Sequence, residues 1–307
     1  MNIDYFSKVK VLDGGMGQAL LAKGLKARGS LWSASALIEK KYHQLVIDTH
    51  LDFIKSGADI IVTNNFSARR KRMIDNKVEE QFDYANEKAG ELALKAKEIS
   101  KKNVLVAGSL PAQNNTYILD DRDKNLIKKD FLDQANLLKP FVDFFYLDVL
   151  SSIREVEIAL NVVEKINLPV LVGIHIKKNG KLPSGESITE MVKECKSKKW
   201  LGLVAACVSP EIIENTIGEI KTLEIPFGFK ANLWKEEPLP VHKIVKINKD
   251  DGFGENPVDV LGSRADFTDE VFCNFSKKMV SEGATILGGC CETKPSHISA
   301  IAKLKQN

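Results

Sequence analysis

The stretch Ser56-Gly57-Ala58-Asp59-Ile60-Ile61-Val62-Thr63-Asn64 decides the fold of this chain of 307 residues. A helical pattern before it stops at Gly57, because glycine tolerates the left-handed conformation that ends many helices. The apolar run at 60–62 then predicts a buried strand with a polar end. The same order returns at Glu282-Gly283-Ala284-Thr285. Helix, glycine and short apolar strand in this order are typical of parallel βαβ units.

Outward from this unit, apolar β-branched runs alternate with helical patterns along the whole chain. Strands are expected near Lys10–Asp13, Asp59–Thr63, Val104–Gly108, Phe144–Asp148, Val170–Ile174, Gly202–Cys207, Pro226–Lys230 and Thr285–Gly288. Helices are expected near Ile38–Lys55, Glu79–Lys101, Asn125–Lys139, Ile153–Ile166, Ile188–Lys198, Glu211–Leu223, Asp269–Glu282 and Pro295–Leu304. Repetition of this unit around the chain predicts an α/β protein, a (β/α)₈ TIM barrel in which residues 1–307 form a single domain.

A doubly wound open sheet is the main rival to the barrel, and it would place a glycine-rich phosphate-binding turn after its first strand. Asp13-Gly14-Gly15-Met16-Gly17 is rich in glycine but does not match GxGxxG, so the barrel is favoured. Clusters of proline, glycine and charge at about 231–267 predict one long loop after strand seven. Barrel enzymes carry substrate-binding elaborations in such loops.

Composition and charge exclude several classes of protein. With 44% hydrophobic and 28% charged residues the chain has an ordinary globular composition, and its net charge of +3 gives no support for nucleic acid binding. The N-terminus lacks the apolar stretch of a secretory signal, and no apolar run reaches the ~18 residues of a membrane span. We expect a cytoplasmic protein without a membrane or nucleic acid partner, and a homo-oligomer stays open.

Three cysteines follow the ends of two predicted strands, where barrel residues face the active-site mouth. Cys207 ends the sixth strand, and Cys290 and Cys291 follow the eighth. Three thiolates with one open coordination position form the pattern of a catalytic zinc site, whereas structural zinc sites usually have four protein ligands. Adjacent cysteines reach one metal only if the strand has ended, and Gly288-Gly289 is expected to supply the backbone freedom for that turn.

Other interpretations of the cysteines stay open. The three at the strand ends are alternatively buried structural thiols, or Cys290 and Cys291 form a vicinal redox disulfide. Cys195 and Cys273 lie inside predicted helices, and for them a role as inert core thiols is favoured. The histidines that follow strand five and lie in the last helix, His175 and His297, are not expected to bind the metal.

Six segments together resemble the homocysteine S-methyltransferase family, which includes enzymes that use betaine, S-methylmethionine or S-adenosylmethionine, and the resemblance runs from residue 12 to about residue 301. They are Leu12–Gly17, Ser30–Ala34, Gly57–Asn64, Gly108-Ser109, Ser184–Ser187 and Gly288–Thr293. The Gly-Gly-Cys-Cys motif with an upstream cysteine is the most specific of these. The resemblance implies a barrel that binds Zn²⁺ through Cys207, Cys290 and Cys291, with the homocysteine thiol as fourth ligand.

The implied reaction is methyl transfer from a cationic sulfonium or ammonium donor to homocysteine, which forms methionine. No catalytic side chain is expected beyond the substrate thiol that the metal activates. The first loop, which consists of Asp13 and the glycines after it, resembles the family's homocysteine-binding loop. Asp148 aligns with the family's glutamate, which binds the amino group of homocysteine. Trp32 either faces the cationic donor or simply packs. The predicted substrate-binding residues are Asp13, Gly14, Gly15, Trp32, Asn64, Ser109 and Asp148.

Three positions depart from the family's pattern. Ala206 precedes Cys207 where asparagine is usual, Gln18 stands where threonine is common, and Asp148 is one methylene shorter than glutamate. The donor therefore stays open between S-methylmethionine, S-adenosylmethionine and betaine. The alternatives are a methyltransferase for another small thiol or selenol, and a zinc- and thiol-binding barrel with altered catalysis. A cobalamin- or folate-dependent synthase is less expected, because no second domain follows residue 307.

Overall fold

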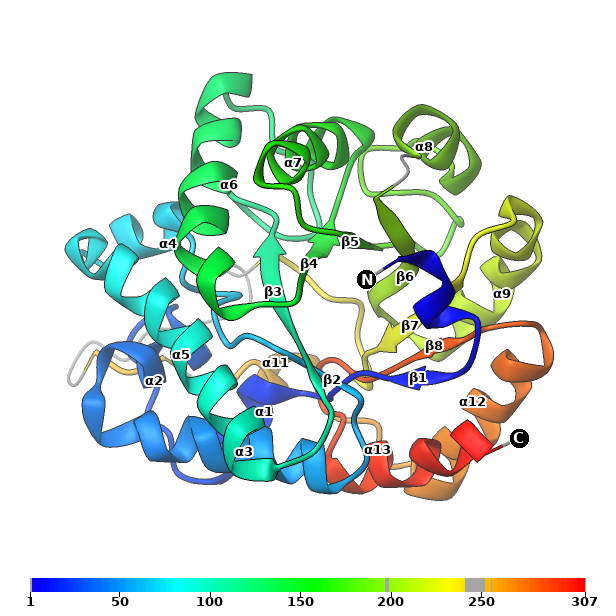
Figure 1. The fold of residues 1–307 in the computed structure, drawn as a ribbon, viewed down its shortest axis with the longest axis horizontal. Coiled ribbons are helices and arrows are strands. Elements are labelled where there is room, and N and C mark those ends of the chain that lie inside the picture. Colours follow the sequence, from blue (N-terminus) through cyan, green and yellow to red (C-terminus); the bar gives the residue numbers. More distant parts are fainter. Residues whose placement is uncertain (1, 197–198, 241–251, 255, 307) are drawn as a thin grey trace.

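The computed structural model describes residues 2–196, 199–240, 252–254 and 256–306, and it shows a parallel barrel surrounded by helices (Figure 1). The 8 strands are β1 (Lys10–Val11), β2 (Ile60–Val62), β3 (Leu105–Pro111), β4 (Phe144–Leu150), β5 (Val170–Ile174), β6 (Trp200–Val208), β7 (Phe227–Ala231) and β8 (Ile286–Leu287). Every predicted strand is present, although β1, β2 and β8 are shorter than expected. The prediction of a (β/α)₈ barrel is confirmed.

Hydrogen bonds between β1 and β2 close the barrel. The strands follow the order β1-β8-β7-β6-β5-β4-β3-β2, and a parallel bridge between Leu12 and Ile60 joins the two ends of that order. Two backbone hydrogen bonds support the bridge, from Asp13 N to the Ile60 carbonyl at 3.0 Å and from Asp59 N to the Val11 carbonyl at 2.7 Å. The strand that follows Gly57 is thus the one that closes the ring.

Helices surround the barrel, and their bounds mostly follow the predicted periodicity. They are α1 (Met16–Ala22), α2 (Ser35–Ile38), α3 (His43–Lys55), α4 (Arg70–Asp75), α5 (Phe82–Ser100), α6 (Lys124–Leu138), α7 (Ile153–Ile166), α8 (Ile188–Cys195), α9 (Pro210–Ile220), α11 (Val258–Leu261), α12 (Asp269–Ser281) and α13 (Pro295–Ala302). The prediction of one helix from Ile38 to Lys55 is wrong, because α2 ends at Ile38 and α3 begins at His43. None of the described helices is long and apolar enough to cross a bilayer.

The apolar core has two layers. Side chains that alternate along the strands fill the barrel interior, and Phe144 and Tyr146 of β4 lie there while Phe145 and Leu147 face the helices. Phe6, from a short 3-10 helix at Ile3–Phe6, belongs to the interior cluster and is fully buried. The interior is therefore packed with side chains, and space for a substrate remains at the carboxyl ends of the strands.

The long segment after β7 is partly structured, so its prediction as one loop needs correction. Helix α11 lies within it, and Trp234 pairs with Ser263 in an antiparallel bridge. The Asn256 side chain accepts a hydrogen bond from Val258 N at 3.2 Å, which supports the start of this short helix. Residues 241–251 and 255 of the predicted loop lie outside the described residues.

Candidate active site

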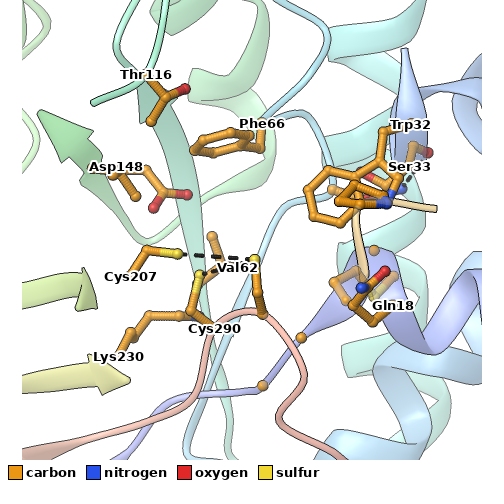
Figure 2. Close-up of a pocket in the computed structure, with 18 of the residues that line it drawn as sticks. Gln18, Trp32, Ser33, Val62, Phe66, Thr116, Asp148, Cys207, Lys230 and Cys290 are labelled. Carbon is orange, nitrogen blue, oxygen red and sulfur yellow. Dashed lines mark hydrogen bonds between the residues drawn. The ribbon is translucent and has the colours of Figure 1, made fainter. Parts of the chain in front are cut away.

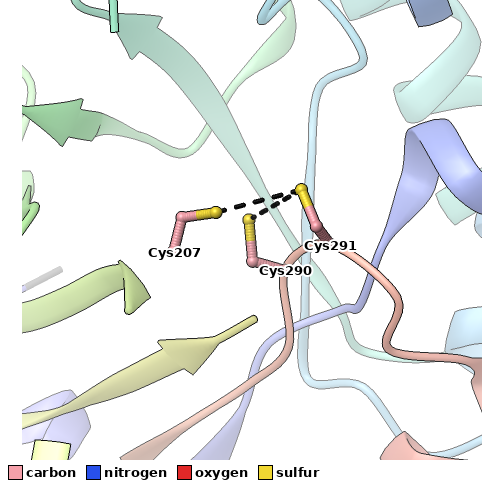
Figure 3. Close-up of side chains that lie close together, drawn as sticks. All are labelled: Cys207, Cys290 and Cys291. Atoms are coloured by element: carbon pink, nitrogen blue, oxygen red, sulfur yellow. Dashed lines mark hydrogen bonds between the residues drawn. The ribbon is translucent and has the colours of Figure 1, made fainter. Parts of the chain in front are cut away.

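Three cysteine sulfurs meet at the mouth of the barrel (Figure 3). The Cys207 and Cys291 sulfurs are 3.8 Å apart, and the Cys290 and Cys291 sulfurs are 3.9 Å apart. All three lie within 4.8 Å of one another, and in the described part of the chain they form one group able to hold a metal ion. Residues separated by more than 80 positions in the chain thus come together as the sequence predicts.

Irregular backbone turns the site residues of β4 and β6 toward the mouth. The register of β6 shifts between Ala206 and Val208, and Cys207 has a φ of 56°. The register of β4 shifts between Leu147 and Leu150, and Val149 has a φ of 65°. Positive φ is uncommon for residues other than glycine and is an outlier for β-branched valine, and such conformations concentrate at functional sites. Both irregularities fall at the mouth of the barrel.

The glycines before the cysteine pair act through their lack of a side chain. Neither Gly288 nor Gly289 has a positive φ, so the expectation that they supply backbone freedom is wrong. A Cβ on Gly289 would instead meet Thr293 Oγ1 at 2.1 Å. That hydroxyl donates a hydrogen bond to the Cys290 carbonyl at 2.6 Å. Close packing of Thr293 against Gly289 therefore shapes the turn that presents Cys290 and Cys291.

The substitution Gly289→Ala is expected to destabilise the protein by about 2 kcal/mol and to weaken metal binding, because the added methyl group displaces Thr293 and the cysteine turn. Urea unfolding and metal titration measure both effects. Gly218→Ala in α9 is the matched control, because a Cβ there meets nothing within 4 Å and alanine favours helix. A Gly289→Ala variant as stable and as rich in metal as Gly218→Ala would contradict this account.

The thiols influence one another strongly. Hydrogen bonds from the Cys290 and Cys291 thiols lower the pKa of Cys207 well below its ordinary value. Burial and the neighbouring thiols raise the pKa of Cys291 well above its ordinary value. One thiolate is therefore stabilised at the expense of the others, and all three ionise together only beside a cation.

A buried ion pair lies near the cysteines, and the sequence predicts only one of its two members, Asp13. Lys230 Nζ of β7 contacts Asp13 Oδ1 at 2.6 Å, and Asp13 Oδ2 accepts a hydrogen bond from Val62 N at 2.8 Å. The Asp13 carboxylate is therefore already bonded within the barrel, although it also lines the mouth. The one signal for Lys230 is its position as a lysine inside the apolar strand Phe227-Gly228-Phe229-Lys230-Ala231.

Asp148 points into the cavity from the end of β4 (Figure 2). Its Oδ2 accepts a hydrogen bond from Ser109 Oγ at 2.8 Å. Burial raises the pKa of Asp148 to about 7, while the nearby Lys230 cation acts in the opposite direction. Ser109 itself is fully buried behind Asp148, so it reaches the site through that carboxylate.

The first loop and the segment after β2 form the facing wall of the cavity. Gly14 and Gly15 line it, and the Trp32 indole packs over Gly17, where a Cβ would meet the ring at 2.6 Å. Asn64 also lines the cavity, and its Nδ2 donates to the Ser33 carbonyl at 3.1 Å. Figure 2 shows Trp32 and Gln18 across the cavity from Asp148 and Cys207.

Tyr117 is a second neighbour of the cysteines that the sequence does not predict. Its hydroxyl lies 3.3 Å from Cys207 Sγ, and its ring meets His175 edge to face with centroids 4.7 Å apart. Tyr117 belongs to the irregular connection after β3, which has no periodic pattern. No sequence signal points to it for that reason.

The remaining cysteines and histidines have other contacts. Cys195 is buried in the core between helices and strands, as expected, and Cys273 Sγ lies 3.5 Å from the Ala300 carbonyl. His297 Nδ1 accepts a hydrogen bond from Lys294 N at 2.9 Å at the start of α13. His175 Nδ1 lies 3.4 Å from the Ala206 carbonyl. These contacts are structural.

Comparison with known proteins assigns this constellation to a family. The family model for homocysteine S-methyltransferase matches residues 10–304. The chain belongs to the homocysteine S-methyltransferase family. Homocysteine S-methyltransferase 1 of Arabidopsis thaliana is 27% identical over 95% of this chain and 92% of its own length. S-methylmethionine–homocysteine S-methyltransferase BHMT2 of Pongo abelii is 28% identical over 96% of this chain and 78% of its own length. The chain is therefore a methyltransferase, as its motifs predict.

A solved structure shares the fold of this homocysteine S-methyltransferase. The homocysteine methyltransferase MmuM from Escherichia coli, in its oxidized form, superposes with a TM-score of 0.78 at 20% identity and covers 96% of this chain and 95% of that one. The metallated form of MmuM superposes with a TM-score of 0.76 at 18% identity, over 96% of each chain. These similarities support the barrel.

Hydrogen bonds are present at or near Ala206 and Gln18, two positions where the methyltransferase departs from its family's pattern. Near Ala206, the Asn232 side chain donates to the Cys207 carbonyl at 2.6 Å and so supports the backbone of that cysteine. Gln18 Nε2 donates to Glu292, the residue after Cys291, and to Asn256 Oδ1 at 3.2 Å. Gln18 therefore links the first loop to the cysteine turn.

Proposed function

We propose that the enzyme transfers a methyl group from a cationic sulfonium or ammonium donor to the thiol of homocysteine at a Zn²⁺ site, which yields methionine. The convergence of Cys207, Cys290 and Cys291 carries this proposal. Tetrahedral zinc with sulfur ligands at about 2.3 Å requires sulfurs roughly 3.8 Å apart. The sulfur separations of 3.8 and 3.9 Å fit that requirement, and three protein ligands leave one position for a substrate.

The cysteine thiolates would hold the metal, and the chemistry of the site follows from their charge. Zn²⁺, when bound, lowers the pKa of a thiol in its shell from the usual ~8.5, so that the substrate sulfur is nucleophilic at neutral pH. Three thiolates around a divalent ion keep one net negative charge, which attracts a cationic donor. The new S–CH₃ bond forms as the donor's onium–CH₃ bond breaks, and the bonding pair stays on the donor atom.

Other side chains of the cavity would hold the two substrates. Asp148 is suited to the ammonium group of homocysteine, because among the described residues of the cavity wall it is the carboxylate that the Lys230–Asp13 pair leaves free. Trp32 presents an aromatic face at the opposite wall, where a cationic donor gains ~0.5–2 kcal/mol. Apolar neighbours such as Val62, Phe66 and Val149 keep water away from the reacting atoms.

A panel of donors with homocysteine as acceptor tests the proposal. Zinc-loaded protein is expected to form methionine with S-methylmethionine, S-adenosylmethionine or betaine, and removal of the metal by a chelator is expected to stop the reaction. Mass spectrometry measures the methionine. The absence of methionine with every donor, or activity that survives metal removal, would overturn the proposal. Replacement of homocysteine by other small thiols and selenols tests the acceptor. The cytoplasmic location and a homo-oligomeric state stay predictions.

The substitution Asp148→Asn is expected to raise the KM for homocysteine about tenfold or more, because it removes the charged partner of the substrate ammonium. The wild-type carboxyl ionises as the pH rises through about 7, so its KM for homocysteine should fall over that range. The Asn variant should lack this step. Initial rates between pH 6 and 8 with saturating donor measure both effects, and an unchanged KM would remove Asp148 from the site.

A further inference from the structure

Two arginines lie buried beside the cavity, Arg69 directly before α4 and Arg72 within it. Arg69 is fully buried, and Arg72 is 4% exposed. Arg72 lines the cavity that also contains Asp148 and the cysteines. The Arg69 guanidinium lies 5.1 Å above the ring of Phe66, another residue of the cavity wall. Two cationic side chains are therefore packed against one edge of the site.

These guanidinium groups have few acceptors. Arg69 Nη1 donates to the Ala112 carbonyl at 2.5 Å and to Thr116 Oγ1 at 3.1 Å, whereas its Nε and Nη2 have no hydrogen-bond partner in the described residues. Arg72 Nη1 donates to Ser67 Oγ at 2.8 Å. Within residues 2–196, 199–240, 252–254 and 256–306, no carboxylate lies within 4.0 Å of either arginine.

Arg70, which follows Arg69 in the sequence, shows the usual arrangement for an arginine, in which the guanidinium pairs with carboxylates. Its Nη2 lies 2.9 Å from Asp133, and its Nε lies 3.7 Å from Asp130. Arg69 and Arg72 differ because they are buried without such a partner in the part of the chain that the structure describes. Burial lowers the pKa of both, to about 10 for Arg69, and the Arg69 charge further lowers the pKa of Arg72. A buried cation without a counter-charge is costly, so this edge of the cavity favours an anion.

We propose that Arg72, with Arg69 behind it, binds the carboxylate of an amino-acid substrate in the cavity. The planar guanidinium fork matches a carboxylate, and Asp148 in the same cavity suits an ammonium group. Besides Asp13 and Lys230, which pair with each other, the described residues of the cavity thus offer one acidic and one basic side chain to a zwitterion. The proposal rests on the proposed function, under which two substrates carry a carboxylate: homocysteine, and a donor such as S-methylmethionine.

Calorimetric titration of zinc-loaded protein tests carboxylate binding by Arg72 without any need for turnover. The probes are homocysteine and S-methylmethionine, each compared with its decarboxylated counterpart, 3-aminopropanethiol and (3-aminopropyl)dimethylsulfonium. Wild-type protein is expected to bind one carboxylate probe about tenfold or more tightly than its counterpart. Arg72→Met should remove that preference, and Arg72→Lys should retain part of it. The probe whose preference is lost identifies the substrate that Arg72 binds.

Arg70→Met is the matched control, because it removes a neighbouring arginine that pairs with Asp133 and Asp130, which do not line the cavity, and its carboxylate preference should equal that of wild type. Circular dichroism and zinc content verify that each variant is folded. The proposal is overturned if wild type binds the probes and their counterparts with equal affinity, or if folded Arg72→Met keeps the full preference. A carboxylate preference that depends on Arg72, found in protein that transfers no methyl group, would refute the proposed function alone. Methyl transfer to homocysteine by protein whose carboxylate preference does not depend on Arg72 would refute only the role of Arg72.

Discussion

Replacement of Cys207 by alanine is expected to remove bound metal and to lower kcat/KM for homocysteine methylation by more than about 100-fold. Its sulfur lies 3.8 Å from that of Cys291 and is the one contribution of β6 to the cluster. Loss of a residue that only supports a ligand already costs about 10–100-fold in affinity or activity, so the loss of a ligand should cost more. Elemental analysis of the purified protein and initial rates measure the two effects.

The substitution Cys195→Ala is the control for Cys207→Ala, because it makes the same chemical change in a buried thiol of α8 that lies in the core. It should keep the metal and the activity, with a small loss of stability from the cavity it leaves. If Cys207→Ala retained full metal occupancy and full methylation, the zinc site would have to be abandoned.

Replacement of Lys230 by methionine is expected to destabilise the protein by about 3–5 kcal/mol, because it leaves the buried Asp13 carboxylate without its counter-charge. Both members of the pair are buried, and they are joined by a contact of 2.6 Å. Asp13 also accepts the hydrogen bond from Val62 N that links the end of β1 to β2. The uncompensated charge therefore lies where the barrel closes. Urea unfolding followed by circular dichroism measures the loss.

Two further variants separate the buried charge from other causes. Asp13→Asn combined with Lys230→Met removes both charges and should regain most of the stability, since replacing a whole buried pair is often nearly neutral. Lys278→Met breaks the exposed pair with Glu214 and should cost no more than about 1 kcal/mol. Equal losses for Lys230→Met and Lys278→Met would show that the buried pair has no special role.

The strands were predictable because a buried strand of a parallel barrel is a short apolar run with helical patterns on either side. The run at β5, Val170–Ile174, has the bounds that the sequence predicts. Short helices such as α4 and α11 were missed, because they carry few periodic positions and depend on local contacts. The break between α2 and α3 was missed for the same reason, since helical residues continue across it.

For the site, the sequence identified the residues at the strand ends but not all of their roles. Cys207, Cys290 and Cys291 were recognisable because thiols at the ends of two strands are rare and chemically distinctive. Tyr117 and Arg72 gave no such signal, because Tyr117 lies in an irregular connection and Arg72 lies in the short helix α4, which carries few periodic positions. Gly289 was recognised, but its role depends on the close approach of Thr293, which no local pattern reveals.

The sequence by itself therefore determined the order of strands and helices, the family and the identity of the thiols, because these follow from local periodicity and from short motifs. Only the tertiary structure decided which distant groups compensate one another. Lys230 and Asp13 are 217 positions apart, and Cys207 and Cys291 are 84 apart. The energy of a buried charge or thiolate depends on the partners within a few ångströms, and in a closed barrel those partners come from strands that are remote in the chain.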